Sequence, residues 1–243
     1  MVFSPPERVR GPLISRLEAI ESRIVRACER AGRPRSAVTL VAVSKTYPAS
    51  AIREAMAAGV RHFGENRVQE LKQKVEEIPG GLAGGEAVWH MIGHIQRNKV
   101  RDVVACADAV HSVDSLRLAE ELNDRALAAG RHIPCFVQVN VSGEASKFGL
   151  DPEALDPLLA GLAPLDGLQV QGFMTLASPA ANPESVRPEF RMLREFYEQA
   201  RTRYAHLAGM HALSMGMSGD FEVAIEEGAT HVRIGSALFG SRS

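Results

Sequence analysis

Lys45 is the side chain in this sequence that is best placed for covalent chemistry. It lies two residues beyond residues 38–43 (VTLVAV), a short, nearly continuous apolar run rich in β-branched residues. Such a run is typical of a strand buried on both faces, so Lys45 is expected where solvent access is limited. Burial favours the neutral amine, which can attack an aldehyde to form a Schiff base. The alternative is a lysine that extends its charge from a strand end into water.

Two glycine-containing turns near the end of the sequence could bind an anion. One is residues 214–218 (SMGMS), and the other begins at Gly235, where Ser236 could cap a short helix. Free backbone N–H groups at a helix start attract anions, and glycine allows the backbone to approach a ligand closely. Each turn alone is equally compatible with an ordinary loop. The two together favour a phosphate site.

Arg233 lies between Val232 and Ile234 and is therefore expected to be buried. A buried guanidinium without an acceptor is very costly, so Arg233 needs either a structural ion pair or a ligand atom. His90 and His94 raise the question of a metal site, but no cysteine or carboxylate lies near them at a known ligand spacing. We expect no metal site.

Alternating strands and helices are expected to position these residues. A helix is predicted from about residue 13 to residue 31, and Asp114 and Ser218 are predicted to cap two of the later helices. Eight short segments are predicted to be strands, at or leading into residues 38–43, 62–64, 89–93, 109–113, 133–141, 168–175, 212–215 and 231–235. Eight strand-then-helix units predict an α/β fold, a single (β/α)8 barrel of the TIM type.

One domain is expected over residues 1–243, with an extra N-terminal helix within residues 1–35 packed on the barrel. In a parallel barrel, binding and catalytic residues lie at the C-terminal ends of the strands. Lys45, Arg233 and the two glycine turns all fall at such ends. Lys72 and Lys74, in contrast, lie in a polar helix and are expected to be exposed to solvent.

Composition excludes several classes of protein. The 243 residues have a formal net charge of −1, with 45% hydrophobic and 23% charged residues, so neither nucleic acid nor an anionic membrane is an expected partner. The three cysteines form no CxxC pair, which argues against a zinc or disulfide framework and favours a reducing cytoplasm. No signal peptide and no apolar run of membrane-spanning length is recognisable.

The chain resembles the pyridoxal phosphate homeostasis proteins, a family related to the N-terminal barrel domain of alanine racemase. The segments that carry the resemblance run in order across nearly the whole chain, at residues 41–46, 63–66, 69–70, 89–96, 98–99, 146–149, 172–174, 213–218, 232–236 and 239–240. A single one of these motifs would be weak, whereas six or more in the same order are highly specific. The resemblance implies pyridoxal 5′-phosphate (PLP) as the cofactor.

The resemblance also implies roles for individual residues. Lys45 would carry PLP as a Schiff base, and Arg233 would approach the pyridine nitrogen. The remaining PLP contacts that it implies are Ser214, Gly235 and Ser236 at the phosphate, backbone donors near Gly216, Asn66 near the ring, and His90 and Met217 as neighbours of the pocket. Lys147 would be a second lysine that receives PLP in transfer, unless it merely neutralises Glu144.

Bound PLP does not by itself make an enzyme. A racemase needs two acid/base groups, one on each face of the reacting carbon. In alanine racemase the second is a tyrosine from another domain of a partner subunit, and we expect no such domain here, since the sequence ends at Ser243. An arginine beside the pyridine nitrogen also makes the ring a weaker electron sink. We therefore expect a PLP carrier without strong turnover.

The alternatives are a PLP-dependent amino-acid racemase or related PLP enzyme, a Schiff-base aldolase acting on a sugar phosphate, and an interaction protein that uses the barrel as a scaffold. For the carrier, we expect PLP-dependent apo-enzymes as recipients, a monomer, and a cytoplasmic location without membrane or nucleic-acid partners.

Overall fold

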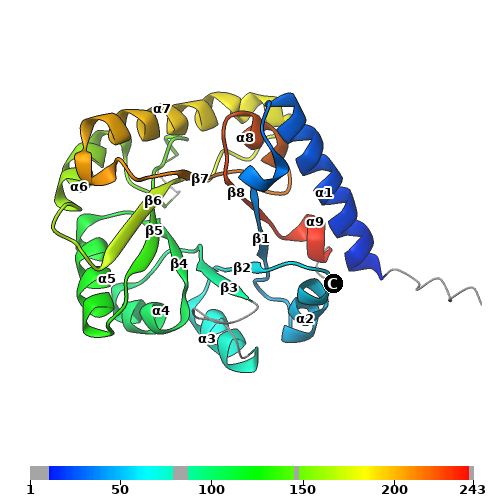
Figure 1. Ribbon diagram of the computed structural model, residues 1–243, viewed down its shortest axis with the longest axis horizontal. Helices are drawn as coiled ribbons and strands as arrows, with labels where there is room; N and C mark the ends of the chain where they lie inside the picture. Colours follow the sequence, from blue (N-terminus) through cyan, green and yellow to red (C-terminus); the bar gives the residue numbers. More distant parts are fainter. Residues whose placement is uncertain (1–10, 79–86, 145–147, 241–243) are drawn as a thin grey trace, which may run out of the picture.

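Parallel strands form a closed barrel in the computed structural model, which describes residues 11–78, 87–144 and 148–240 (Figure 1). The strands are β1 (Thr39–Val43), β2 (His62–Glu65), β3 (Val88–Met91), β4 (Ala109–Val113), β5 (Ile133–Gln138), β6 (Leu168–Met174), β7 (Ala212–Ser214) and β8 (His231–Ile234). Each strand pairs with the next, and β8 closes on β1 with Arg233 opposite Val41. The predicted barrel is therefore confirmed.

Helices follow the strands and cover the outside of the barrel (Figure 1). They are α1 (Pro12–Arg30), α2 (Ala49–Ala57), α3 (Val68–Glu77), α4 (Val100–Cys106), α5 (Leu116–Ala128), α6 (Leu155–Gly161), α7 (Arg187–Arg203), α8 (Phe221–Glu226) and α9 (Ser236–Phe239). Short 3-10 turns cover Arg35–Ala37, Arg97–Lys99, Pro152–Ala154, Pro183–Val186 and Ala205–Leu207. Helix α1 precedes β1 and packs against α8 and α9.

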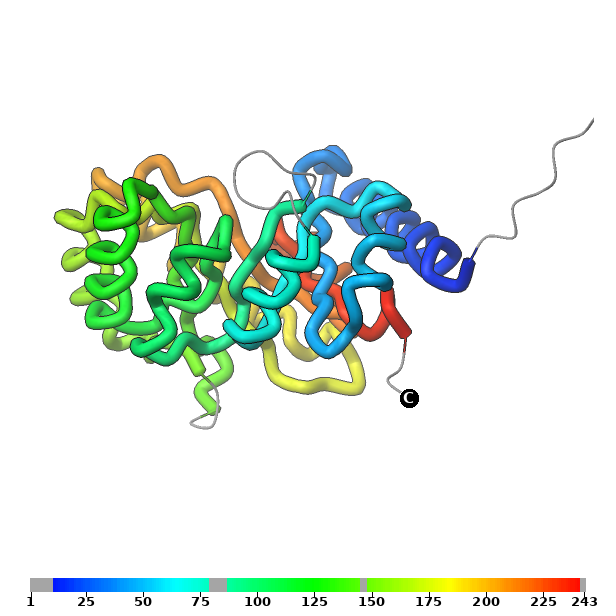
Figure 2. Tube along the Cα trace, turned by 90° about the horizontal axis from the view of Figure 1, so that it is seen from below, coloured from blue at the N-terminus to red at the C-terminus, as the bar shows by residue number. Residues whose placement is uncertain are grey.

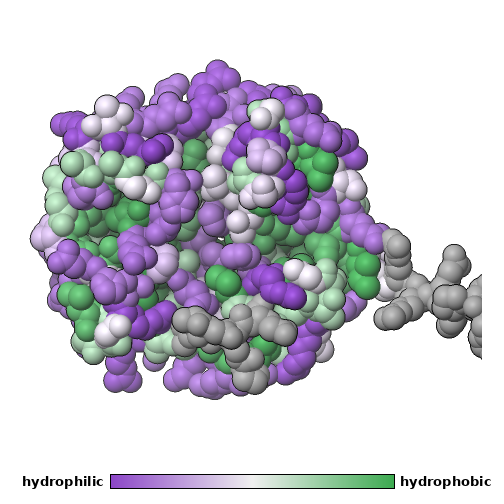
Figure 3. Space-filling view, in the orientation of Figure 1, coloured by the Kyte–Doolittle hydropathy of each residue, from purple (hydrophilic) through white to green (hydrophobic). Residues whose placement is uncertain are grey.

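The pattern of apolar residues explains these elements. One face of α1 packs against the barrel. Its residues Leu13, Leu17, Ile20 and Ile24 repeat at helical spacing and are all buried. All five residues of β4 are buried, as expected for a strand covered on both faces. On the face of the molecule drawn in Figure 3, polar residues are spread widely, and apolar residues show mainly in the gaps between them.

Several expected details of the caps and ends are wrong. Ser115, not Asp114, caps α5, because its side chain accepts a hydrogen bond from the Leu118 N–H. Asp220, not Ser218, precedes α8. Ser236 is the first residue of α9 and not its cap, a position that Gly235 occupies. In each case the cap lies one or two residues from the expected position, and for α5 and α8 the reason is that another polar residue lies close by.

Two further differences concern the segment around β5 and β6. The fifth strand ends at Gln138 and not at residue 141, because the Asn140 N–H turns away to donate to the Leu150 carbonyl. Helix α6 follows β5, as the predicted strand-then-helix units require, but its residue range was not predicted. Seen from the side in Figure 2, the segments after β5 (green) and β6 (yellow) project from the same end of the barrel. None of the helices in the described parts of the chain is long and apolar enough to cross a bilayer.

A network of ion pairs fastens α7 to α8 and predicts a dependence of stability on pH. Glu227 has a side chain only 6% exposed, and its carboxylate contacts Arg187 at 3.0 Å and both Arg191 and Arg194 at 3.2 Å. Burial alone would raise the pKa of Glu227, but hydrogen bonds from Arg191 and Arg187 outweigh it and lower the pKa. The stabilisation is therefore present above about pH 4.3, where an unfolded-state glutamate ionises, and is lost as pH falls through the lowered pKa.

Glu227→Gln is expected to lower the free energy of unfolding by about 1–3 kcal/mol at pH 7, since a buried charged hydrogen-bond acceptor is lost. The difference from the unmodified protein should shrink below about pH 4. Urea unfolding at several pH values measures both effects. Glu198→Gln is the control, because Glu198 is 63% exposed and pairs only loosely with Arg194, at 3.8 Å. A difference that stays constant with pH would contradict this account of the network.

Candidate functional site

The carboxyl ends of the strands enclose a cavity of about 370 Å³. Its lining comes from residues at or after the ends of β1, β2, β3, β6, β7 and β8, namely Val43, Lys45, Tyr47, Asn66, Ile92, Leu176, Met217, Ser218, Gly219, Arg233, Gly235 and Ser236. Its volume falls within the range of small-molecule sites, about 300–1,000 Å³. The cavity also lies at the end of the barrel where such sites occur in this fold.

Lys45 stands on a tight turn immediately after β1. The turn is closed by a 3.0 Å hydrogen bond from the Tyr47 N–H to the Ser44 carbonyl. Its third residue, Thr46, has φ +69°, a conformation that is strained for a β-branched residue. The Thr46 N–H donates to Glu70 on α3 at 2.8 Å, which helps to hold this backbone in place. Strain of this kind persists where surrounding contacts over-determine the backbone, and it is enriched at functional sites.

A buried ion pair contacts Ser44, the first residue of the same turn. Lys74 on α3 is 6% exposed and pairs with the fully buried Glu65, and its Nζ donates to the Ser44 carbonyl at 2.6 Å. Ser44 Oγ also donates to Glu65 Oε1, at 2.6 Å. Burial raises the pKa of Glu65, and the hydrogen bonds from Lys74 and Ser44 oppose that effect. The expectation that Lys74 is exposed is therefore wrong, because it lies on the buried face of α3 with Val68 and Leu71.

Arg233 is 3% exposed, as expected from its neighbours in the sequence. Its guanidinium donates to Ser214 Oγ at 2.6 Å and to the Thr175 carbonyl at 2.7 Å. Within the described residues it has no carboxylate at ion-pair distance, so the acceptors that satisfy it are neutral. Burial lowers the pKa of Arg233 to about 10, against the opposing charge of Asp220. The side chain remains a cation at neutral pH.

The structure brings six of the nine expected site residues to the cavity: Lys45, Asn66, Met217, Arg233, Gly235 and Ser236. It does not bring Ser214, Gly216 or His90 to the cavity lining. Ser214 is fully buried beneath Arg233. Gly216 has φ +92° and lies so close to α8 that a Cβ atom would come within 2.6 Å of Ala224 Cβ. Its carbonyl accepts a hydrogen bond from the Arg233 N–H.

His90 belongs to a row of side chains inside the barrel that sequence reasoning missed. Its Nε2 lies 2.9 Å from His62 Nδ1, and its Nδ1 lies 2.8 Å from His111 Nε2. His111 Nδ1 lies in turn 2.8 Å from Ser214 Oγ. Burial lowers the pKa values of His90 and His111 well below that of free histidine, and it lowers that of His62 too. The sequence signal that could have revealed this row was one histidine in each of three consecutive predicted strands.

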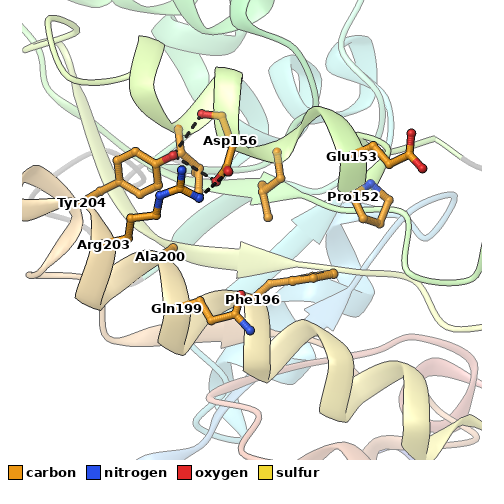
Figure 4. A pocket seen from close by; sticks show the side chains of 10 residues that line it. Pro152, Glu153, Asp156, Phe196, Gln199, Ala200, Arg203 and Tyr204 are labelled. Carbon is orange, nitrogen blue, oxygen red and sulfur yellow. Dashed lines mark hydrogen bonds and ion pairs between the residues drawn. The ribbon is translucent and has the colours of Figure 1, made fainter.

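A second cavity, of about 300 Å³, lies between α6 and α7 on the outside of the barrel (Figure 4). Asp156 accepts hydrogen bonds there from Arg203 and from the Tyr204 hydroxyl. This cavity contains no lysine, and an ion pair joins two of its charged groups, Arg203 and Asp156. Lys147 lies outside the described residues. Within those residues, no group of three or more His, Cys, Asp or Glu side chains is arranged to hold a metal ion.

Comparison with known proteins identifies the family. Residues 15–243 match the family described as alanine racemase, N-terminal domain. A protein from Aquifex aeolicus named pyridoxal phosphate homeostasis protein is 44% identical over 227 residues, covering 93% of this chain and 97% of that protein. A protein of the same name from Pseudomonas aeruginosa is 45% identical over 223 residues, covering 92% and 93%.

Solved structures agree with this assignment. PipY of Synechococcus elongatus, solved without PLP, has a TM-score of 0.84 and 39% identity, and covers 94% of this chain and all of that chain. The same protein solved with PLP bound has a TM-score of 0.80 and 38% identity. An alanine racemase from Clostridium difficile shares the fold at a TM-score of 0.68, with 16% identity over 57% of that chain. The chain belongs to the pyridoxal phosphate homeostasis protein family, and its barrel has the fold of the alanine racemase N-terminal domain.

Proposed function

We propose that this protein binds PLP as a Schiff base on Lys45 and acts in intracellular PLP homeostasis. The observation that carries the proposal is that Lys45, Arg233 and Ser236 line the same cavity. They offer an amine, a cation and a hydroxyl to the aldehyde, ring nitrogen and phosphate of one small molecule. The solved structure of PipY with PLP bound, a protein 38% identical to this chain, is independent support for the proposal.

Lys45 is suited to the covalent step. Among the described residues, its Nζ has no hydrogen-bond or ion-pair partner, so the amine is not engaged elsewhere in the fold. The neutral amine adds to the aldehyde carbon, and water leaves as the C=N bond forms. Bound PLP supplies a carbonyl that exchanges with amines and a ring that withdraws electrons. The turn at Thr46 is held in place by its hydrogen bond to Glu70, and it fixes the position that the aldehyde carbon must occupy.

Other residues of the cavity would hold the remainder of the molecule. Arg233 uses two N–H groups on neutral acceptors, so further donors remain for the pyridine nitrogen. Since the guanidinium stays protonated, that nitrogen would accept and carry no proton of its own. Ser236, Gly235 and Ser218 lie together at the ends of β7 and β8 and would contact the phosphate. In this proposal the buried Ser214 acts through Arg233.

The contacts of Tyr47 favour a carrier over an amino-acid racemase. Tyr47 is the tyrosine that lines the cavity, and its hydroxyl donates to the Gly240 carbonyl at 2.7 Å. Its ring stacks on Phe239 at 4.8 Å between centroids. A tyrosine held in this way is poorly placed to be the second acid/base group of a racemase. Incubation with L-alanine and with L-serine tests the alternative, since D-amino acid formed in proportion to protein would contradict the carrier.

Binding of PLP is expected to be saturable and to depend on the phosphate group. A titration followed by visible absorbance should show one site for PLP, and pyridoxal, which lacks the phosphate, should bind at least about tenfold more weakly because charge-assisted hydrogen bonds are lost. Pyridoxamine 5′-phosphate serves as the control that has the phosphate but no aldehyde. Equal affinity for PLP and pyridoxal would rule out the phosphate site at Ser236.

The wider role is part of the same proposal. PLP-dependent apo-enzymes would be the recipients of the carried PLP, and the protein would act in the cytoplasm as a monomer. Light scattering should then give a mass near 26.3 kDa. Mixing the loaded protein with an apo-enzyme should restore that enzyme's activity faster than release of PLP into buffer allows. A dimer, or restoration no faster than release, would contradict these two points.

A further inference from the structure

Four hydrogen bonds in series join two cavities at opposite ends of the barrel. At the N-terminal end, His62 lines a cavity formed by residues at or before the starts of β1 and β2, with Glu21 and Arg35 at its wall. At the C-terminal end, Arg233 lines the proposed PLP cavity. The side chains between them are His90, His111 and Ser214, and each lies within 2.9 Å of the next polar atom in the series.

Arg233 determines the direction of this series. A guanidinium can only donate, so Ser214 Oγ accepts from it. The hydroxyl hydrogen of Ser214 then needs an acceptor, because Ser214 is fully buried. Among the described residues, His111 Nδ1 is the other atom in hydrogen-bond contact with that oxygen. His111 must therefore accept at Nδ1, and the neutral ring carries its hydrogen on Nε2.

The same reasoning passes along the row. His111 Nε2–H donates to His90 Nδ1, so His90 carries its hydrogen on Nε2 and donates to His62 Nδ1. All three rings are thus neutral and in the same tautomer. A proton added to His90 or His111 would place two hydrogens in one hydrogen bond. The direction in which burial moves the pKa values of these two rings agrees with that conclusion.

We propose that His111 is a positioning residue for Arg233. By accepting the hydrogen of Ser214, it turns a lone pair of the hydroxyl toward the guanidinium. The guanidinium is then held against Ser214 and the Thr175 carbonyl, at the floor of the cavity. The importance of this arrangement for PLP rests on the proposed function, whereas the order of the hydrogen bonds rests on the protein alone.

His111 is itself held firmly by its neighbours. Its ring packs against Phe136 at 4.2 Å between centroids, and His231 approaches it edge-on at 5.9 Å. His231 is turned away from the row, since its Nδ1 is 2.9 Å from Thr230 Oγ1. The ring of His111 therefore cannot shift without disturbing the interior packing, and its Nδ1 presents a fixed acceptor to Ser214.

Nitrogen-15 NMR of the histidine rings tests the order directly, in protein without PLP at neutral pH. His62, His90 and His111 are each expected to show a protonated Nε2 and an unprotonated Nδ1. A hydrogen on Nδ1 of His111, or a charged His111 ring, would overturn the proposal. This measurement needs no variant, so it stands even if substitutions in the row prevent folding.

Variants test the consequence for Arg233. His111→Phe removes the acceptor, and PLP affinity is expected to fall about tenfold, the usual effect of losing one hydrogen bond to a charged group. His111→Asn keeps an oxygen acceptor near the position of Nδ1 and should restore most of the affinity. Ser214→Ala should match His111→Phe, and circular dichroism should show all three folded. Unchanged affinity in folded His111→Phe would overturn the positioning role.

The two experiments separate the possible failures. If the unmodified protein does not bind PLP, the proposed function fails while the ring tautomers still report on the row. If PLP binds but His111 carries its hydrogen on Nδ1, the positioning role fails and the proposed function stands.

Discussion

Lys45→Ala is expected to abolish covalent retention of PLP while leaving the barrel folded. Lys45 is half-buried, and within the described residues it supports no hydrogen bond or ion pair of the fold, so its truncation should change stability little. Loss of the amine removes the one bond that would survive borohydride reduction and denaturation. The visible absorbance of the loaded protein should disappear, as measured after gel filtration to remove free PLP.

Lys72→Ala is the matched control for that experiment. Lys72 is an exposed lysine on α3, and the substitution removes the same side chain from a surface position. The control should retain PLP like the unmodified protein. Retention of reduced PLP by Lys45→Ala, with circular dichroism unchanged, would remove Lys45 from its proposed role and would favour either a different lysine or a noncovalent site.

Lys74→Met is expected to destabilise the protein by about 3–5 kcal/mol, because it leaves the buried carboxylate of Glu65 without its counter-ion. One oxygen of Glu65 already has no hydrogen-bond partner in the described part of the chain. The Ser44 carbonyl also loses one of its two donors and keeps only the Tyr47 N–H, so the turn that bears Lys45 should loosen and PLP affinity should fall as well. Urea unfolding gives the change in stability, and absorbance titration gives the change in affinity.

Lys72→Met serves as the control here, since an exposed substitution should stay within about 0.5 kcal/mol. Combining Lys74→Met with Glu65→Gln should recover part of the stability, because no charge is then left unpaired. A Lys74→Met protein as stable as the unmodified one would mean that the ion pair does not hold the turn.

The barrel could be predicted from the sequence because several strands, such as β1 and β4, are short, nearly continuous apolar runs, and strands alternate with helices along the chain. That alternation is typical of a parallel sheet buried on both faces. Lys45 and Arg233 were identifiable because a charged residue beside or within such a run needs a specific reason. Helix caps were misplaced by a residue or two at Asp114 and Ser218, where neighbouring polar residues compete for the same role.

The contacts between elements could not be predicted from local pattern. Lys74 looks exposed in a polar helix, and its burial depends on Glu65, which lies nine residues earlier at the end of β2. Likewise, Ser214 was expected at the phosphate, but its partner His111 is 103 residues away in the chain. Long-range polar pairs of this kind depend on how the strands are registered around the barrel, which no single segment specifies.

Peptide mapping after borohydride reduction of the PLP-loaded protein tests the Schiff base at Lys45 most directly. Reduction makes the C=N bond permanent, and mass spectrometry of the digest then locates the modified lysine. We predict a single modified position, Lys45, in protein loaded with one equivalent of PLP. Modification confined to Lys147 or Lys99, or bound PLP that leaves every lysine unmodified, would contradict this account of the site.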